Sequence, residues 1–223
     1  MTKKILMILT NTSQLDEAHP TGVWLEEYKT PYEAFKEAGF EVELASPKGG
    51  LSPIDPKSKI ETTEEKMQEI EEKLNNTIKL ENINTEDYIA VFFPGGHGVM
   101  MDLPEDEKLG EMITEFYCCN KLIGAVCHGA VGLINAKKPN GEAMIKGKKI
   151  TAISNIEENM SQNAPFVPFF LEDKLKELGA LYSASAPEKS YIVMDDNLIT
   201  GQNVQSTKIL AENFVNLLQE NND

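Results

Sequence analysis

The clearest chemical signal in the chain is Cys127 followed directly by His128. A thiol beside an imidazole can act as a nucleophile whose proton the imidazole accepts. The apolar run 122–126 is typical of a buried strand, and a helix-compatible stretch follows at 128–135. Cys127 is therefore expected at a sharp strand-to-helix turn. There the side chain would be exposed to solvent, and the N–H groups of the new helix would lower the pKa of the thiol.

The residues around Cys127 strengthen this interpretation. Ala125-Val126-Cys127-His128-Gly129 has the small-x-nucleophile-x-small form of a nucleophile elbow, in which small neighbours relieve crowding around a strained backbone. The alternative is a small buried core thiol, the commonest state of a free cysteine. The other two cysteines, Cys118 and Cys119, are expected to pack in the core or to be partly exposed, without a catalytic role.

A second glycine-rich segment, Gly95-Gly96-His97-Gly98, follows another apolar run. Its backbone can approach a ligand closely, so the N–H of Gly96, together with the N–H of His128, is expected to form an oxyanion hole. A plain tight turn is the alternative. A phosphate-binding loop is disfavoured, because neither GxGxxG nor GxxxxGK[ST] is present. His19 and His97 are too scattered to indicate a metal site and are expected to be loop histidines.

Several glutamates could complete the site. A base for Cys127 needs an orienting carboxylate, and either Glu157 or Glu158 could supply it. Glu27 is expected near the start of the first helix, at the same edge of the sheet. Taken alone, each of these glutamates would be interpreted as a helix N-terminal charge. If Glu27 is partly buried beside the thiol, its pKa should rise toward neutrality, as a general base requires.

These residues must be positioned by alternating strands and helices, which predict a parallel α/β sheet covered by helices. The expected strands are 4–9, 41–46, 88–93, 121–126, 149–153 and 197–200. The expected helices are 28–38, 62–74, 107–117, 128–135, 168–178 and 206–218. Gly39 and Gly179 suit helix C-termini, and Pro31 and Pro168 suit first helical turns. Ligands of such a sheet bind beyond the carboxyl ends of its strands.

The 223 residues are expected to form a single domain, 1–223, with irregular insertions near 11–25 and 47–85. Acidic residues outnumber basic ones by 36 to 21, and the net charge of −15 disfavours a nucleic-acid partner. The apolar runs are too short to cross a membrane. Three cysteines without a disulfide framework or a CxxC pattern are typical of the cytoplasm. The run 61–73 is expected to form a solvated surface helix.

Five motifs, taken in order, resemble the ThiJ/PfpI superfamily over nearly the whole chain, and within it the branch of glutathione-independent glyoxalases (glyoxalase III) and heat-shock-type chaperones. They lie at residues 21–31, 45–58, 94–98, 125–129 and 200–203. The resemblance implies a flavodoxin-like, glutamine-amidotransferase-like sandwich of parallel sheet and helices, with a nucleophile elbow.

The resemblance also implies roles for individual residues. Cys127 would be the nucleophile, His128 its neighbour in a Cys-His-Glu triad, and Glu27 the carboxylate that contacts the thiol. Glu158 would be the third triad member, with Glu157 left open. The histidine that many relatives carry further along is missing, because no histidine follows residue 128.

Gly95, Gly96, His128 and Trp24 are expected to surround the substrate. The expected reaction converts methylglyoxal or a related 2-oxoaldehyde to the 2-hydroxy acid, D-lactate for methylglyoxal, with no cofactor and no metal. The alternatives are a stress chaperone, redox sensor or protein deglycase, and a cysteine hydrolase of peptides or amides. A homodimer is expected, with unfolded or glycated proteins as further partners.

Overall fold

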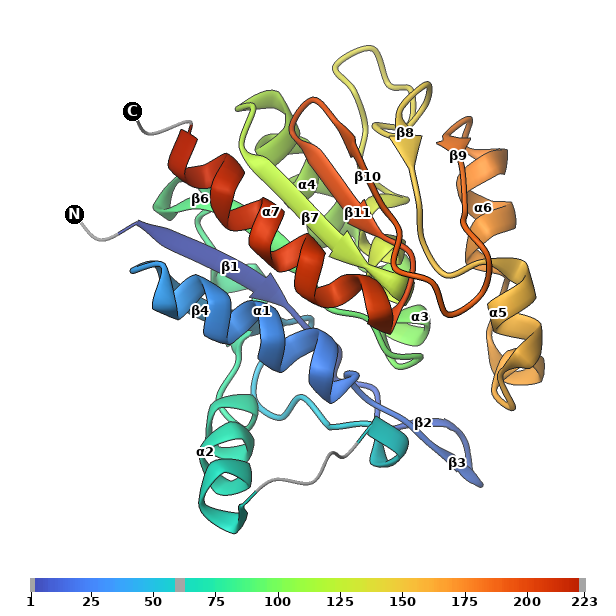
Figure 1. The fold of residues 1–223 in the computed structure, drawn as a ribbon. Helices are drawn as coiled ribbons and strands as arrows, with labels where there is room; N and C mark the ends of the chain where they lie inside the picture. Colours follow the sequence, from blue (N-terminus) through green and yellow to red (C-terminus); the bar gives the residue numbers. More distant parts are fainter. Residues whose placement is uncertain (1–2, 59–62, 221–223) are drawn as a thin grey trace.

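A seven-stranded sheet forms the centre of the fold in the computed structural model, which describes residues 3–58 and 63–220 (Figure 1). Its strands, in spatial order, are β10 (Ile192–Asp195), β11 (Leu198–Gly201), β7 (Leu122–Val126), β6 (Tyr88–Phe93), β1 (Lys4–Ile8), β4 (Glu41–Ser46) and β5 (Ile78–Lys79). All pairings are parallel except that of β10 with β11. The buried apolar residues of β1, β6 and β7 account for the near-continuous hydrophobic runs seen in the sequence. The predicted flavodoxin-like α/β class is confirmed.

Five of the six predicted strands belong to this sheet, but the prediction for 149–153 is wrong. Only β8 (Lys149–Ile150) forms there, and it pairs with β9 (Leu181–Tyr182) in a separate two-stranded sheet. The edge position is taken instead by β10, which runs antiparallel to β11. A two-residue turn, Asp196-Asn197, joins them, and Asp196 adopts a left-handed φ of 52°. Asp and Asn favour such hairpin turns, so this signal was present in the sequence.

Helices cover the sheet on both faces. The α-helices of the described residues are α1 (Leu25–Glu37), α2 (Glu64–Leu74), α3 (Val99–Asp102), α4 (Glu107–Cys118), α5 (Asn155–Met160), α6 (Leu171–Glu177) and α7 (Thr207–Glu220), of which α2, α5 and α6 lie beside the sheet (Figure 1). Helices α1 and α7 pack side by side on one face of the sheet, and α4 packs against β7 on the opposite face (Figure 1). The predicted start at Thr62 lies outside the described residues, and α2 is capped by Thr63.

The predicted glycine positions are confirmed, whereas both proline predictions are wrong. Gly39 and Gly179 follow the ends of α1 and α6 with φ values of 88° and 85°. Pro31 lies inside α1 rather than in its first turn, because α1 begins at Leu25. Pro168 lies before α6.

The segment after Cys127 is not an α-helix, as the sequence predicted, but the 3₁₀ helix Cys127–Leu133. Two glycines explain this winding, because they disfavour an α-helix and allow the segment to lie against β6. A Cβ atom at Gly129 would lie 2.3 Å from the carbonyl oxygen of Phe93, and one at Gly132 would lie 2.5 Å from the Phe93 ring. The strand-to-helix turn is therefore held tightly against its neighbouring strand.

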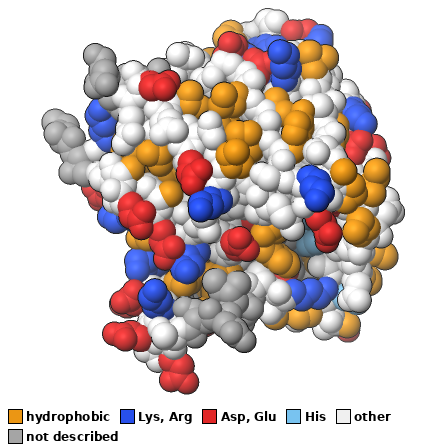
Figure 2. Space-filling view, viewed as in Figure 1, with side chains coloured by type: hydrophobic (Ala, Val, Ile, Leu, Met, Phe, Trp, Pro, Cys, Tyr) orange, Lys and Arg blue, Asp and Glu red, His pale blue; other side chains and the backbone are white. Residues whose placement is uncertain are grey.

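The remaining elements and the surface complete the description. The insertion near 11–25 contains a small hairpin of β2 (Gln14–Asp16) and β3 (His19–Pro20). In the part of the chain that is described, no helix is long and apolar enough to cross a membrane. Figure 2 shows acidic, basic and hydrophobic side chains interspersed on the face viewed.

Candidate active site

Cys127 occupies a strained turn at the carboxyl end of β7. Its φ of 57° lies in the left-handed region, which residues with a side chain rarely adopt. Val126, the last residue of β7, is extended, and the 3₁₀ helix begins at Cys127 itself. Strain of this kind at a sharp strand-to-helix turn defines a nucleophile elbow, so this part of the expectation from sequence is confirmed.

The expected exposure and low pKa of Cys127 are wrong. The residue is only 6% exposed. Burial first, and then the nearby Glu27 carboxyl group, raise the pKa of the thiol well above its ordinary value, although the His128 N–H opposes them. The hydrogen bond from the His128 N–H does not outweigh this desolvation. Cys127 is consequently a thiol at neutral pH, and a base must remove its proton during reaction.

Glu27 lies in the first turn of α1 and is completely buried. Its Oε2 accepts a hydrogen bond of 2.8 Å from the N–H of Gly95, and the Cys127 thiol is a further hydrogen-bond partner of the carboxyl group. Burial raises the pKa of Glu27 to about 8, while the bonds from Gly95 and Cys127 lower it. This carboxyl group can therefore both accept and donate a proton near neutral pH.

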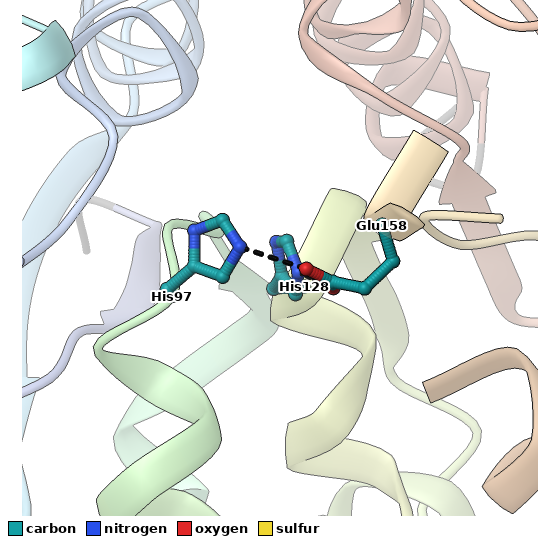
Figure 3. Close-up of side chains that lie close together, drawn as sticks. All are labelled: His97, His128 and Glu158. Carbon is teal, nitrogen blue, oxygen red and sulfur yellow. Dashed lines mark hydrogen bonds and ion pairs between the residues drawn. The ribbon is translucent and has the colours of Figure 1, made fainter. Parts of the chain in front are cut away.

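His128 lies between Cys127 and Glu158. Its Nδ1 is 3.4 Å from the Cys127 Sγ, and its Nε2 is 2.6 Å from Glu158 Oε2. The two side chains come from different elements, His128 from the 3₁₀ helix and Glu158 from α5 (Figure 3). Burial would raise the pKa of Glu158, but His128 and then His97 hold it well below its usual range. An ionised Glu158 can thus orient the imidazole and stabilise its charged form.

The choice between Glu157 and Glu158 follows from how α5 begins. Ser154 and Glu157 form a capping box, in which the Ser154 Oγ accepts the Glu157 N–H and the Glu157 carboxylate accepts the Ser154 N–H. Glu157 also accepts hydrogen bonds from Gln202 and Asn203, away from His128. The Ser-x-x-Glu spacing is a recognisable signal, and it could have assigned Glu157 to the cap from sequence alone.

His97, expected to be an isolated loop histidine, belongs to the same cluster. Its Nε2 lies 3.0 Å from Glu158 Oε1, and its ring centroid lies 4.2 Å from that of His128 (Figure 3). It follows β6, which pairs with β7, so the carboxyl ends of two adjacent strands bring the histidines together. That adjacency was the signal available in the sequence. The remaining histidine, His19, stacks on Phe166 at 3.8 Å.

His97, His128 and Glu158 also form a set whose ligating atoms all lie within 4.8 Å of one another. Two imidazoles and a carboxylate can ligate a divalent cation in principle. In the present arrangement each imidazole Nε2 is instead hydrogen-bonded to a carboxylate oxygen of Glu158. The expectation that the site needs no metal stays a prediction.

The glycine-rich loop lines the same cavity as the thiol. Gly96 has a φ of 104°, and a Cβ atom there would lie 2.3 Å from the carbonyl oxygen of Gly22. A Cβ at Gly95 would lie 2.5 Å from Glu27 Oε2. The Gly95 N–H is bonded to Glu27, so Gly95 positions that carboxyl group, while its carbonyl accepts the Trp24 N–H at 3.0 Å.

The site opens into a cavity of about 400 Å³, lined by Cys127, His128, Glu27, Glu158, Gly96, His97 and Trp24 among others. Of the residues expected from sequence to bind substrate, Trp24, Gly96 and His128 therefore lie together beside the thiol. The cavity is of the size that holds a small molecule. Cys118 and Cys119 lie elsewhere and are exposed.

The chain belongs to the DJ-1/PfpI family, whose model matches residues 19–217. Glyoxalase 3 of Candida albicans is 29% identical, with 95% of this chain and 97% of the relative covered. The crystal structure of glyoxalase III from the same organism has a TM-score of 0.86 at 29% identity and covers 96% of both chains.

Two further relatives are similar along most of their length. The glutathione-independent glyoxalase hsp3102 of Schizosaccharomyces pombe is 32% identical, with 89% of each chain covered. The structure of the 24 kDa Rapid Encystment Protein of Francisella tularensis has a TM-score of 0.90 at 34% identity and covers 96% of this chain and 98% of that one. The resemblance expected from the sequence motifs is thus confirmed.

Proposed function

We propose that this protein is a glutathione-independent glyoxalase that converts methylglyoxal or a related 2-oxoaldehyde, with water, to the 2-hydroxy acid. The observation that carries the proposal is the placement of the Cys127 thiol between two proton-transfer groups, His128 and Glu27, at the base of a small cavity. The names of the relatives, glyoxalase 3 and glutathione-independent glyoxalase, support the same substrate class.

The first step forms a carbon–sulfur bond. Cys127 Sγ adds to the aldehyde carbon, C1, while His128 Nδ1, 3.4 Å from the sulfur, accepts the thiol proton. Glu158 stabilises the resulting imidazolium through its 2.6 Å contact with Nε2. The oxyanion of the hemithioacetal accepts hydrogen bonds from the N–H groups of Gly96 and His128. Because the thiol begins protonated, this base is essential for addition.

The second step moves a proton between the two carbon atoms. Ionised Glu27 removes the proton from C1 to give an enediolate, and protonated Glu27 returns a proton to C2. A pKa near 8 suits both halves of this transfer, because the free energies of the two protonation states are close near neutral pH. The His128 imidazolium gives the proton that it took from the thiol to the oxygen of C2. The product is a 2-hydroxy thioester of Cys127, which water hydrolyses to the 2-hydroxy acid and the free thiol. No oxidant or reductant enters or leaves.

The decisive experiment incubates the pure protein with methylglyoxal, without glutathione and in the presence of a chelator, and assays lactate with enantiomer-specific dehydrogenases. We expect D-lactate from the wild type and from Cys118→Ala, a matched change at an exposed cysteine, and none from Cys127→Ala. Absence of lactate from the wild type, or equal lactate from both cysteine variants, would overturn the proposal.

A protein client is the second candidate. Helix α5 exposes Ile156 and Met160, at 63% and 60%, and Met160 also lines the cavity, so the entrance has an apolar edge that an unfolded or glycated protein could contact. Suppression of aggregation by wild type and Cys127→Ala alike would support this function. A redox sensor is disfavoured, because the protonated, buried thiol of Cys127 reacts slowly with peroxide.

The wider setting of the protein follows from the same considerations. A small-molecule 2-oxoaldehyde is the substrate, and a reducing cytoplasm, where Cys127 stays a thiol, is the compartment. From the family resemblance alone we also infer a single domain, 1–223, and a homodimer. Size-exclusion chromatography with light scattering tests the dimer, and limited proteolysis tests the single domain.

A further inference from the structure

Lys57, Asn163 and His97 form a hydrogen-bonded chain from the edge of the cavity to Glu158. Lys57 Nζ lies 3.0 Å from Asn163 Oδ1, and Asn163 Nδ2 lies 3.3 Å from His97 Nδ1. His97 Nε2 lies 3.0 Å from Glu158 Oε1. Lys57 is exposed, whereas Asn163, His97 and Glu158 are 3%, 8% and 1% exposed. This series of hydrogen bonds therefore links the Lys57 ammonium at the surface to the buried Glu158 carboxylate that contacts His128.

The chemistry of each group determines the direction of every bond. A lysine ammonium only donates, so the Asn163 oxygen must face it and the Asn163 NH₂ must face His97. The NH₂ group only donates, so His97 Nδ1 must be an acceptor without a proton. The proton of neutral His97 then resides on Nε2, which donates to Glu158. Ser161 Oγ, 3.4 Å from the same Nε2, is a weaker second acceptor.

We propose that Lys57, Asn163 and His97 are positioning residues, which fix the Nε2–H tautomer of His97 so that Glu158 receives an N–H on Oε1 and keeps Oε2 for His128. Glu158 is thereby anchored from two sides. His128 must carry its own proton on Nε2, which leaves Nδ1 free to accept the proton of Cys127. A lysine at the cavity edge thus sets the protonation pattern of the imidazole beside the nucleophile.

The surroundings of His97 are consistent with a neutral ring. Burial and the adjacent His128 lower the pKa of His97, and they outweigh Glu158 and Asp55, the acidic groups near it. A neutral ring has one proton, so the tautomer matters. If Nδ1 carried that proton, the lone pair of Nε2 would face the Glu158 carboxylate, and the two would repel each other.

The test is a measurement of the tautomers by long-range ¹H–¹⁵N correlation spectra of the imidazole rings at pH 7. The chain has three histidines, so spectra of His97→Gln and His19→Gln complete the assignment. We expect a proton on Nε2 and none on Nδ1 for both His97 and His128. A proton on Nδ1 of His97 in the wild type would overturn the inference, whether or not the protein turns over methylglyoxal.

Asn163→Asp tests the role of this hydrogen-bond series in turnover, because Asp has almost the same shape as Asn. The carboxylate can still accept from Lys57, but it favours a proton on His97 Nδ1, so that signal should appear in the spectrum. Its role in turnover rests on the proposed function, and we expect kcat/KM for methylglyoxal to fall roughly tenfold to a hundredfold, the scale for losing an outer partner of a functional group. His97→Gln, whose amide can still donate to Glu158, should retain more activity than His97→Leu.

Asn159→Asp is the matched control, because it adds the same charge beside Glu158 at an exposed position with no bond to His97. Equal losses in Asn163→Asp and Asn159→Asp would mean that added charge alone matters, and would overturn the positioning role. A metal at this cluster is the competing arrangement. Activity lost on treatment with EDTA and restored by Zn²⁺ would also overturn it, since a metal-bound His97 Nε2 cannot donate to Glu158.

Discussion

Glu27 Oε2 accepts a hydrogen bond of 2.8 Å from the backbone N–H of Gly95, which joins the first turn of α1 to the loop that follows β6. The bond aims one carboxyl group of an adjacent glutamate pair at Cys127. Glu26, one residue earlier, is turned away by about 100° of helix rotation and is exposed. The two glutamates therefore have the same side chain, but Glu27 is buried and Glu26 is exposed, so substitutions at the two positions can be compared directly.

Glu27→Gln should retain the fold and lose most of the activity. The amide oxygen can still accept the Gly95 N–H, but the amide cannot move a proton between C1 and C2. We expect kcat/KM for methylglyoxal to fall roughly 10²-fold or more, the usual scale for losing a positioned acid or base. Glu26→Gln is the control and should stay within about twofold of wild type. Similar losses in both variants would show that Glu27 is not the proton-transfer group.

The same substitution should change how stability depends on pH. The pKa of Glu27 is about 8 in the folded protein against an ordinary value of 4.5, so the native state holds a proton that the unfolded state has lost. The free energy of unfolding of the wild type should therefore fall as pH rises from 4.5 to 8. Glu27→Gln has no carboxyl group to titrate at this position, so its free energy of unfolding should not fall in this way. Its advantage over the wild type should be absent near pH 4 and reach on the order of a few kcal/mol at pH 9.

Urea unfolding of wild type, Glu27→Gln and Glu26→Gln at pH 4, 6, 7.5 and 9 measures this dependence. Glu26→Gln should follow the wild type, because Glu26 is exposed. A difference between wild type and Glu27→Gln that does not grow with pH would contradict the raised pKa of Glu27.

Much of the fold could be predicted because buried parallel strands leave continuous apolar runs. Strands β4 and β6 have the predicted bounds, Glu41–Ser46 and Tyr88–Phe93. The prediction failed where short-range pattern and tertiary context disagree. Lys149–Ile150 looks like the start of a central strand, yet it pairs outside the main sheet. Sequence periodicity reports burial, and it does not say which sheet buries a residue.

Most of the residues of the site could be predicted from the sequence, whereas their pKa values could not. Local pattern pointed to Cys127, His128 and Glu27, because each lies near the carboxyl end of an apolar run or at the start of a helix. It left Glu157 and Glu158 open, and only the family resemblance favoured Glu158. It did not place His97 in the cluster. The same pattern suggested an exposed, acidic thiol. The pKa of Cys127 instead depends on how much protein covers it and on the distance to Glu27, and neither is encoded in local spacing.

Limiting iodoacetamide at pH 7 should therefore label Cys118 and Cys119 before Cys127. The first two are exposed, whereas Cys127 is 6% exposed and its thiol has a raised pKa, so it has little of the reactive thiolate. Mass-spectrometric mapping of the three cysteines measures the order. Faster labelling of Cys127 would show that His128 already removes the thiol proton in the resting protein.

Glu158 and His128 should behave as one unit in kinetics, because the carboxylate contacts the imidazole 2.6 Å away and the imidazole contacts Cys127. Glu158→Ala should lower kcat/KM less than Cys127→Ala does, since an orienting group assists the base whereas the thiol forms the covalent intermediate. His128→Ala removes the base itself and should cost more than Glu158→Ala. Once His128 is absent, Glu158 has no base of Cys127 to orient, although it still contacts the His97 imidazole.

The double variant Glu158→Ala/His128→Ala should then be barely worse than His128→Ala alone. Steady-state kcat/KM for the wild type, the two single variants and the double variant completes the cycle, with thermal unfolding of each variant as the check on folding. Losses that multiply would mean that Glu158 acts independently of His128. In that case Glu27 would be the only remaining group able to move protons in the proposed reaction, and the Cys-His-Glu triad would have to be abandoned.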